Sequence, residues 1–385
     1  MNNNVGSLRS LSGFFLALMF GLFLSVPLFA EPAREPDSPS ANGPAQLSPL
    51  QPAPPRQMPE LPRINNPWMN QDQDTEDPVQ VSVPPELPVP ESGPRFAVIP
   101  ARVRPGEPIT VAYTDEFSGP GSRDFQAVLL NPRGTRVGRA PLVSFTYTPE
   151  GQELKAAFLA VPSTVASGVF TVRIEAGGRI IQDILLIVEP RDFVAEVIEL
   201  DQRNTEIRVA PNPQRDRESE ILWAILSRTG TDFYYGGYFI PPVTSTRRTS
   251  FYGDRRVYAY VDGSTETSIH AGVDYGVPTG TEVWACAAGR VILAVSRIST
   301  GNSVILEHLP GVYSLYYHLD SIIAEEGSMV RAGQLLGLSG STGLSTGPHL
   351  HWEIRVAGEN ADPDAFVSRP VLDKDEILRN LIKYN

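Results

Sequence analysis

The five residues His349-Leu350-His351-Trp352-Glu353 set the structure that we expect for the C-terminal part of this chain. Side chains alternate between the two faces of a β-strand, so the two imidazoles would share one face, about 6–7 Å apart along the strand. Leu350 would point to the opposite face and into a core. The sequence therefore predicts a strand that is apolar on one side and carries histidine on the other.

Two more segments carry metal-binding residue types in the same manner. His270 and Asp274 stand four positions apart, and the glycine and valine between them favour an extended strand over a helix. Positions i and i+4 also share a face of a strand, because its side-chain period is two. His318 follows two tyrosines in an apolar run that begins at Val312. We expect these segments to bring their His and Asp side chains to one face of a sheet.

The histidine content supports a single metal site. All five histidines lie within residues 270–351, and none stands in the long segment before them. Cys286 is the only cysteine, so no intramolecular disulfide and no thiolate zinc site can form. Three nitrogen and oxygen ligands with one position open to water is the usual arrangement of catalytic zinc. One imidazole of the 349–351 pair would then bind the metal, and the other would reach only the water.

The remaining histidine and the cysteine are interpreted as structural. His308 stands at the end of a predicted strand before the Pro310-Gly311 turn, and we expect a hairpin-end residue with no ligand role. Cys286 lies in the apolar run 283–287, with no Lys, Arg or His beside it to lower the pKa of the thiol. A small buried side chain is expected there.

Together with their flanking residues, these segments resemble the LytM/lysostaphin-type zinc metallopeptidases, which cut peptide bonds in peptidoglycan. The resemblance covers about residues 241–370. Its first motif carries Tyr252 as an insertion between the usual Phe and Gly. The resembling segments are residues 251–256, 270–275, 289–291, 301–304, 317–319, 340–343 and 345–353.

The resemblance implies a role for each candidate residue. His270, Asp274 and His351 would be the ligands of one Zn²⁺ ion, and His318 and His349 would be the catalytic pair beside the water that zinc activates. Which of the two is the base stays open. The implied fold is a small, mostly antiparallel β domain with a groove over the metal. The implied function is a zinc-dependent endopeptidase that hydrolyses peptide bonds of peptidoglycan in cell-wall remodelling.

Two alternatives remain for this domain. Some proteins of this fold are non-catalytic regulators that activate other cell-wall hydrolases, and those typically lack ligands or catalytic histidines, all of which are present here. Others are latent because an upstream segment plugs the groove, and residues 191–269 could do this. The groove-lining loops are expected at 258–268 and 297–302, and neither indicates which bond is cut. Peptidoglycan is the expected partner, and the regulator alternative adds other cell-wall hydrolases.

The N-terminus predicts export. Residues 1–13 are polar with one positive charge, and an apolar run follows from 14 to 30, as in a secretory signal peptide. Leu28 would stand three positions before a cleavage after Ala30, where a small residue is preferred, so a retained membrane anchor stays open as an alternative. We expect an exported protein that is periplasmic or associated with the cell envelope.

A proline-rich segment follows the signal. Residues 31–94 contain 17 prolines and few large apolar side chains. Such a segment cannot bury enough surface to offset its chain entropy, and proline stiffens it toward an extended form. We therefore expect a disordered spacer.

The predicted fold is dominated by β-strands. Residues 95–190 hold about seven short apolar runs separated by turn residues, which predicts an immunoglobulin-like β-sandwich with a spacing or docking role. Residues 191–240, with an amphipathic helix at 218–226, would connect it to the small antiparallel metallopeptidase domain of residues 241–370. Residues 371–385 would form a tail with a short helix. The seven runs are 96–100, 108–113, 127–130, 142–147, 154–159, 169–174 and 181–188.

The charge of the chain argues against one class of function. The formal net charge is −12 at pH 7. Proteins that bind nucleic acid normally present a basic face to the phosphates. We therefore expect no nucleic-acid partner.

Overall fold

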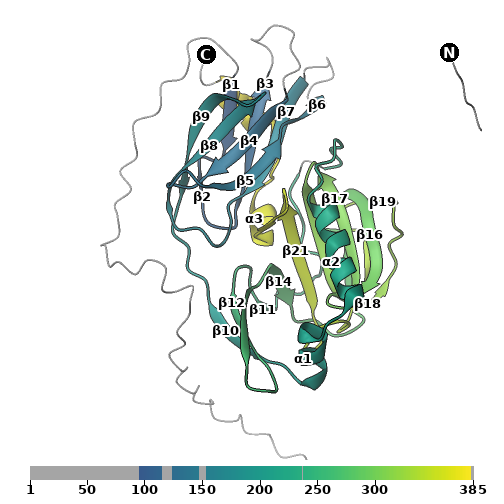
Figure 1. Cartoon of the computed structure of the whole chain (residues 1–385). Coiled ribbons are helices and arrows are strands. Elements are labelled where there is room, and N and C mark those ends of the chain that lie inside the picture. The colour runs from purple at the N-terminus through teal and green to yellow at the C-terminus, as the bar shows by residue number, and fades with distance from the viewer. Residues whose placement is uncertain (1–94, 115–123, 147–152, 236, 383–385) are drawn as a thin grey trace, which may run out of the picture. The chain divides into compact units, whose positions relative to one another are not determined.

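The computed structural model describes residues 95–114, 124–146, 153–235 and 237–382 (Figure 1). Strands dominate these residues, as predicted, and the described ranges contain four helices. The expected signal peptide and proline-rich spacer lie outside the described residues. Within the described ranges, no helix is both long and apolar enough to cross a bilayer.

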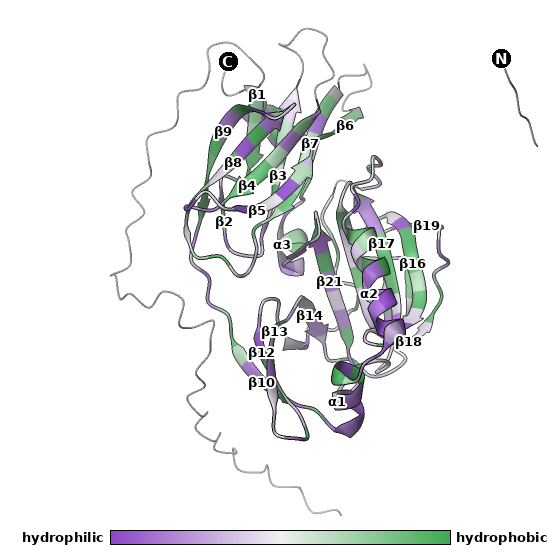
Figure 2. Cartoon of the chain, in the orientation of Figure 1, coloured by the Kyte–Doolittle hydropathy of each residue, from purple (hydrophilic) through white to green (hydrophobic). Residues whose placement is uncertain are grey.

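The first part of the described chain forms two sheets around a shared core. Their strand orders are β1-β3-β7-β6 and β2-β9-β8-β4-β5. In β8 the inward side chains Phe170, Val172 and Ile174 are completely buried and alternate with more exposed residues. Figure 2 shows hydrophobic and hydrophilic bands mixed along the strands of this part of the chain. The strands are β1 (Arg95–Ile99), β2 (Arg102–Val103), β3 (Pro108–Thr114), β4 (Phe125–Leu130), β5 (Arg136–Pro141), β6 (Val143–Thr146), β7 (Glu153–Ala160), β8 (Gly168–Ala176) and β9 (Arg179–Val188).

All seven predicted runs coincide with strands of these two sheets, and the structure adds β2 and β5. β5 has the sequence RVGRAP and is mostly exposed or half-buried, so no apolar alternation marks it. β2 is only two residues long. Two sheets packed around one core are a sandwich architecture. The immunoglobulin-like type of the sandwich stays a prediction.

Most strands after residue 247 join one large sheet in the order β11-β14-β21-β18-β17-β16-β19. Its neighbouring strands are antiparallel, as predicted. The strands are β11 (Arg248–Ser250), β14 (Gly272–Tyr275), β15 (Glu282–Trp284), β16 (Gly289–Arg297), β17 (Gly301–Leu309), β18 (Val312–Ile322), β19 (Met329–Val330), β20 (Leu335–Ser339), β21 (Leu350–Val356) and β22 (Glu359–Ala361).

A smaller sheet stands beside the large one and supplies a wall of the site described below. It has the order β10-β12-β13, formed by β10 (Ala195–Glu199), β12 (Arg255–Ala259) and β13 (Thr265–Ile269). β10 runs parallel to β12, whereas β12 and β13 form an antiparallel pair. This sheet therefore joins a strand from the connecting region to two strands of the predicted metallopeptidase domain.

The helices lie in the connecting region and near the C-terminus. α1 (Gln202–Val209) begins at Asp201, whose side chain accepts a hydrogen bond from the Asn204 amide. α2 (Pro213–Leu226) contains the predicted helix in its second half and buries Leu226 against Ile305 and Leu315 of the large sheet. α3 (Pro363–Ser368) follows β22, and α4 (Lys374–Ile382) is the helix predicted in the C-terminal segment.

Candidate active site

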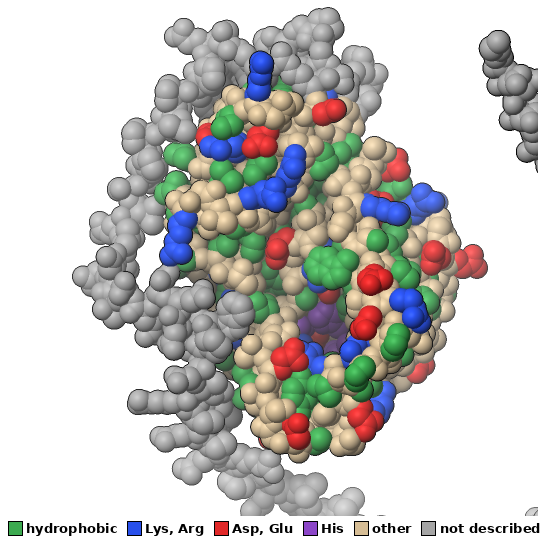
Figure 3. Space-filling model, viewed as in Figure 1, with side chains coloured by type: hydrophobic (Ala, Val, Ile, Leu, Met, Phe, Trp, Pro, Cys, Tyr) green, Lys and Arg blue, Asp and Glu red, His purple; other side chains and the backbone are tan. Residues whose placement is uncertain are grey.

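The five side chains singled out from the sequence surround one pocket. It has a volume of about 260 Å³, and its lining includes His270, Asp274, His318, His349 and His351. In the space-filling view the histidines lie at the bottom of a hollow (Figure 3). The pocket draws these residues from β14, β18, β21 and the segments beside them.

The sequence predicted one extended strand that carries both His270 and Asp274, and this prediction was wrong. β13 ends at Ile269 and β14 begins at Gly272, so His270 stands at the step between the small and the large sheet. Asp274 pairs across the ladder with His351 of β21. A Cβ on Gly272 would lie 2.2 Å from the carbonyl oxygen of Trp352, so glycine permits the close approach of β14 to β21.

β21 places its residues as the strand alternation predicts. Leu350, Trp352 and Ile354 have no exposed surface and belong to the main hydrophobic core. His351 and Glu353 alternate with them. His349 immediately precedes the strand and forms an isolated bridge with Gly340.

Three of the five side chains bring one ligand atom each to a common point. His270 Nε2 lies 3.1 Å from Asp274 Oδ1 and 3.0 Å from His351 Nδ1, and the last two atoms are 2.8 Å apart. One ion can sit about 2.0–2.1 Å from all three corners of such a triangle, which is the bond length of zinc to imidazole and carboxylate. The donor set and its spacing therefore fit a zinc ion with an open fourth position.

The two imidazoles at the common point are held from behind, as metal-binding histidines usually are. His270 Nδ1 donates to the carbonyl oxygen of Phe251 at 2.8 Å, which fixes the tautomer that leaves Nε2 free for a metal. His351 Nε2 lies 3.5 Å from Glu353 Oε2, so its Nδ1 is directed to the common point. The ring of Tyr317 stacks on His351, with 5.5 Å between centroids and 6° between planes.

The electrostatics of the site favour a positive charge at the common point. Burial raises the pKa of Asp274, but His270 and His351 outweigh it and hold that pKa well below its usual range. Burial lowers the pKa of His351, whereas hydrogen bonds to Asp274 and Glu353 raise it to about 9. The two carboxylates that flank this imidazole, Asp274 and Glu353, would likewise stabilise a cation bound beside it.

His318 and His349 form a second pair across the pocket, with ring centroids 4.7 Å apart. His318 Nδ1 donates to the carbonyl oxygen of Thr342 at 2.7 Å, and His349 Nδ1 donates to that of Gly347 at 2.8 Å. Each ring therefore keeps an unprotonated Nε2. Burial lowers the pKa of both imidazoles, that of His318 to about 3, so both are neutral at pH 7.

A local distortion of β18 brings His318 to the pocket. Its backbone has φ of 61°, in the left-handed region that residues with a Cβ rarely adopt. The ladder to β17 also shifts register here, since Val304 pairs with Tyr316 and Asn302 with Leu319. Such a bulge lets two successive residues face one side, and both Tyr317 and His318 line the pocket.

His308 and Cys286, which the sequence analysis interpreted as structural, lie elsewhere in the domain. His308 is fully buried, with Nδ1 donating to the Ala288 carbonyl oxygen at 2.7 Å and Nε2 2.7 Å from Ser314 Oγ. The prediction of a hairpin end is confirmed for the backbone, but the side chain lies in the core. Cys286 is fully buried as expected, and burial raises the pKa of its thiol to about 12.

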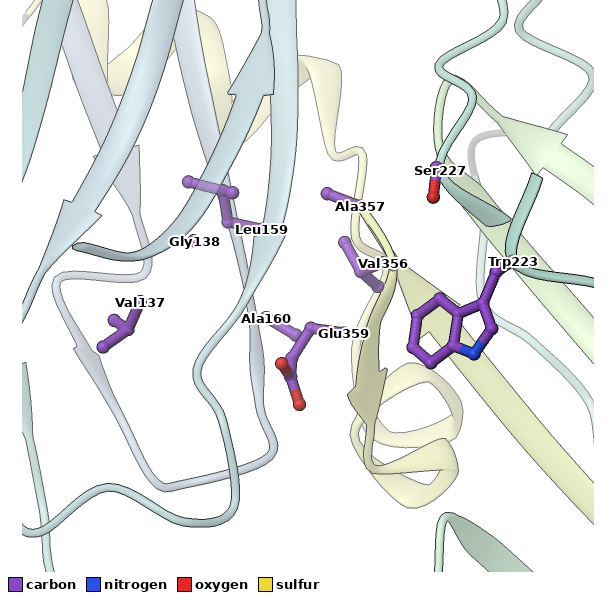
Figure 4. A pocket seen from close by; sticks show the side chains of 10 residues that line it. Val137, Gly138, Leu159, Ala160, Trp223, Ser227, Val356, Ala357 and Glu359 are labelled. Carbon is purple, nitrogen blue, oxygen red and sulfur yellow. The ribbon is translucent and has the colours of Figure 1, made fainter. Parts of the chain in front are cut away.

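A second cavity, of about 330 Å³, does not have the composition of a reaction site (Figure 4). Trp223, Val356 and Leu159 contribute to its lining, and Glu359 is the only ionisable residue among the ten that line it. With one carboxylate and no histidine, this cavity offers neither a metal site nor an acid–base pair.

Several residues of the site were not identified from the sequence. Ile198 and Leu200 from the connecting region line the pocket, as do residues 344–346, outside both loops that were expected to border the groove. Arg256 lines it too, and it stood in the quoted 251–256 segment without an assigned role. Nothing in its local sequence, Asp254-Arg255-Arg256-Val257, distinguishes it from an exposed charge at the start of a strand.

Comparison with known proteins matches part of the chain. The family described as Peptidase family M23 matches residues 268–363. "DD-carboxypeptidase/endopeptidase Mpg" of Neisseria meningitidis is 40% identical over 128 residues, which are 33% of this chain and 29% of the relative. "Peptidoglycan DD-endopeptidase ShyA" of Vibrio cholerae is 40% identical over 89 residues, or 23% of this chain and 21% of the relative.

Among solved structures, one from Pseudomonas aeruginosa that is named as a peptidase M23 covers 69% of this chain and 94% of its own, with 23% identity and a TM-score of 0.46. In the two sequence relatives above, by contrast, the matched region spans less than a third of their own length.

Proposed function

We propose, from the premise that residues 268–363 form a domain of peptidase family M23, that this chain is a zinc-dependent endopeptidase hydrolysing peptide bonds of peptidoglycan. One observation carries the proposal. Three ligand atoms meet at one point, and two neutral imidazoles with unprotonated Nε2 atoms stand beside it. A three-ligand metal site with acid–base groups next to its open position is the arrangement of metal-assisted hydrolysis.

In this proposal His270, Asp274 and His351 hold the metal. Zinc bound there would lower the pKa of water toward about 7 and polarise a carbonyl group. The three ligand side chains are buried, and the hydrogen bonds behind them hold the rings in place before any ion arrives. Little reorganisation would then oppose binding.

The acid–base work falls to His318 and His349. Both donate Nδ1–H to a backbone carbonyl, so each first offers Nε2 as an acceptor. The imidazole that takes the proton of the attacking water becomes a donor at the same atom. It can then pass that proton to the leaving amine, while the second ring lies close enough to interact with the reacting groups. The pair thus supports a full proton cycle, with no base assigned between the two.

The substrate class rests on the relatives. The Neisseria protein is named a DD-carboxypeptidase/endopeptidase and the Vibrio protein a peptidoglycan DD-endopeptidase. We extend peptidoglycan to this chain as its substrate and partner, and we place the protein in the cell envelope, exported by residues 1–30. The regulator alternative is disfavoured, because all five site residues are present around one pocket.

The organisation of the chain follows from the same proposal. We assign the catalytic domain to residues 241–370 and a separate β-sandwich to residues 95–190, which serves spacing or docking. Residues 31–94 would act as the spacer after the signal, and residues 191–240 as the connection between the two folded parts. We assign residues 371–385 to a C-terminal tail that contains the short helix α4.

Zinc content and peptidoglycan hydrolysis of the purified protein test the function, with His349→Ala as the comparison. We expect one zinc per chain in both proteins and soluble fragments released by the wild type alone. Zinc in both with no release by either would contradict an active enzyme and favour a latent enzyme or the regulator. Absence of zinc from the wild type would remove the metal site itself.

A further inference from the structure

A pair of charged residues connects the upstream strand β10 to the metal ligands. Glu196 of β10 stands directly opposite Arg256 of β12 in the parallel ladder. Arg256 lines the metal pocket, but Glu196 lies more than seventy residues before the start of the matched peptidase region, residues 268–363. The region that surrounds the metal thus draws on a part of the chain outside the family match.

Arg256 bridges two carboxylates. Its Nε donates to Glu196 Oε1 at 2.7 Å, and its Nη2 donates to Asp274 Oδ2 at 2.7 Å. The Arg256 side chain is 13% exposed and that of Asp274 is 9% exposed, so both ends of the second contact are largely shielded from water. A guanidinium has donors in fixed directions, so the position of Glu196 sets the direction in which Nη2 points.

This contact leaves Oδ1 of Asp274 as the oxygen that would face a metal. Because Arg256 occupies Oδ2, only Oδ1 remains for the point shared with His270 and His351. The carboxylate is thereby held as a ligand through one oxygen, with its second oxygen neutralised. Burial lowers the pKa of the Arg256 guanidinium, but Asp274, Tyr258 and Glu196 together outweigh burial and raise that pKa.

A second branch leads from Glu196 toward His270. Ser250 Oγ lies 2.9 Å from Glu196 Oε1 and 3.0 Å from Asp254 Oδ2, and 3.2 Å from His270 Nδ1. Asp254 Oδ2 also accepts the amide hydrogen of Phe251, whose carbonyl oxygen receives the His270 Nδ1–H. Two side chains, Ser250 and Asp254, therefore link Glu196 to the Phe251 backbone that orients the His270 ring.

We propose that Glu196 is a positioning residue for the metal ligands, acting through Arg256 on Asp274. This rests on the proposed zinc site. The Glu196 side chain is 29% exposed, so its effect lies in directing the guanidinium and less in the strength of the ion pair itself. Residues that contact a ligand directly, as Arg256 does, typically change metal affinity 10–100-fold when they are altered, and Glu196, one contact further out, should act at the lower end of that range.

Zinc affinity of the full chain, measured by competition with a chromophoric chelator, tests the proposal. Glu196→Gln keeps the shape and removes the charge, and we expect affinity to fall about 10-fold. Glu266→Gln is the matched control. Glu266 lies on β13, the strand beside β12, and pairs with Arg208 of α1 at 3.0 Å, away from the metal ligands. Its affinity should equal that of the wild type. The absorption of the Co²⁺-loaded protein should change with Glu196→Gln alone.

Arg256→Gln and the double variant separate positioning from a general loss of stability. If Glu196 acts through Arg256, the double variant should bind zinc no more weakly than Arg256→Gln. Unchanged affinity in Glu196→Gln, or losses that add in the double variant, would overturn the proposal. If zinc-free Glu196→Gln unfolds at a lower midpoint but binds zinc with unaltered affinity, Glu196 acts on stability alone, and the proposal is also overturned. A wild type that binds no zinc would instead refute the metal site on which the proposal rests.

Discussion

At the scale of single residues, the distance of each imidazole nitrogen from Asp274 Oδ1 separates the proposed ligands from the proposed acid–base groups. His270 Nε2 and His351 Nδ1 lie 3.1 Å and 2.8 Å from Asp274 Oδ1. His349 Nε2 lies 4.0 Å from that oxygen, and neither it nor His318 belongs to the group of three described residues whose ligand atoms meet. The distinction is invisible in the sequence, where the four are equivalent letters. It has a direct experimental consequence.

His318→Ala should keep its zinc and lose turnover, because His318 supplies none of the three atoms that meet at the common point. A positioned acid–base group contributes about 10²–10⁴-fold to rate, and hydrolysis of peptidoglycan should fall by that range. His270→Ala should instead lose the metal. Zinc analysis and rates on the same samples check both, and metal loss from His318→Ala would contradict the assignment.

His308 predicts an acid-sensitive stability that is unrelated to catalysis. Burial lowers the pKa of its imidazole to about 4, against about 6.5 in an unfolded chain. Below pH 6.5 the unfolded chain takes up a proton that the folded protein does not take up until about pH 4. The contribution of His308 to stability is thus present above pH 6.5 and is lost as the pH falls toward 4.

Linkage puts this loss at about 2 kcal/mol between pH 7 and pH 5. Urea unfolding of the wild type and His308→Gln at the two pH values measures it. The wild type should lose about 2 kcal/mol more than the variant, even though the variant is the less stable protein at pH 7. Equal losses would show that His308 is not a neutral buried imidazole.

At the scale of secondary-structure elements, the close approach of β14 to β21 joins the two halves of the metal triangle. Gly272→Ala would place a Cβ 2.2 Å from the Trp352 carbonyl oxygen, so β14 must move away and carry Asp274 from His351. We expect a loss of about 1–3 kcal/mol in stability together with weaker zinc binding. Denaturant unfolding and chelator competition measure the two, and wild-type values in both would contradict the role of this contact.

The sequence predicted elements whose side chains alternate and missed those whose conformation depends on a neighbouring strand. The run 169–174 became β8, and Leu350 lies in the core as its position between two histidines required. The step at His270 and the bulge at His318 were not predicted, because each arises where a strand leaves one partner for another. β10 was missed because its five residues are exposed or half-buried and carry no apolar face.

At the scale of the whole molecule, the metal should contribute measurably to stability. A ligand present at a thousand times its Kd stabilises the folded state by about 4 kcal/mol if it binds only that state. Chelation should lower the unfolding temperature of the wild type, and zinc should restore it. Mg²⁺ should not, since it prefers oxygen ligands and this site offers two imidazoles. An unfolding temperature that is insensitive to the chelator would contradict a site that is filled in the folded protein.

The candidate site could be predicted almost completely, and its surroundings could not. Histidine is scarce in this chain, so residues 270, 318, 349 and 351 stood out, and the nearby Asp274 completed a recognisable donor set. Glu196 is one of many acidic residues, and nothing in its local sequence places it opposite Arg256. That pairing is a tertiary fact, since a parallel ladder needs two segments that are far apart along the chain.

The parallel pairing of β10 with β12 bears on how this domain can be inherited. A recombination event that cut at residue 268 would move the three proposed ligands, His318 and His349 into a new host, but it would leave behind β10, β12 and the arginine that contacts Asp274. Such a hybrid would contain the residues of the candidate site but would lack the Arg256 side chain that contacts Asp274. We therefore expect residues 195–259 and 268–363 to be inherited together, as one unit that is longer than the region matched by the family, residues 268–363.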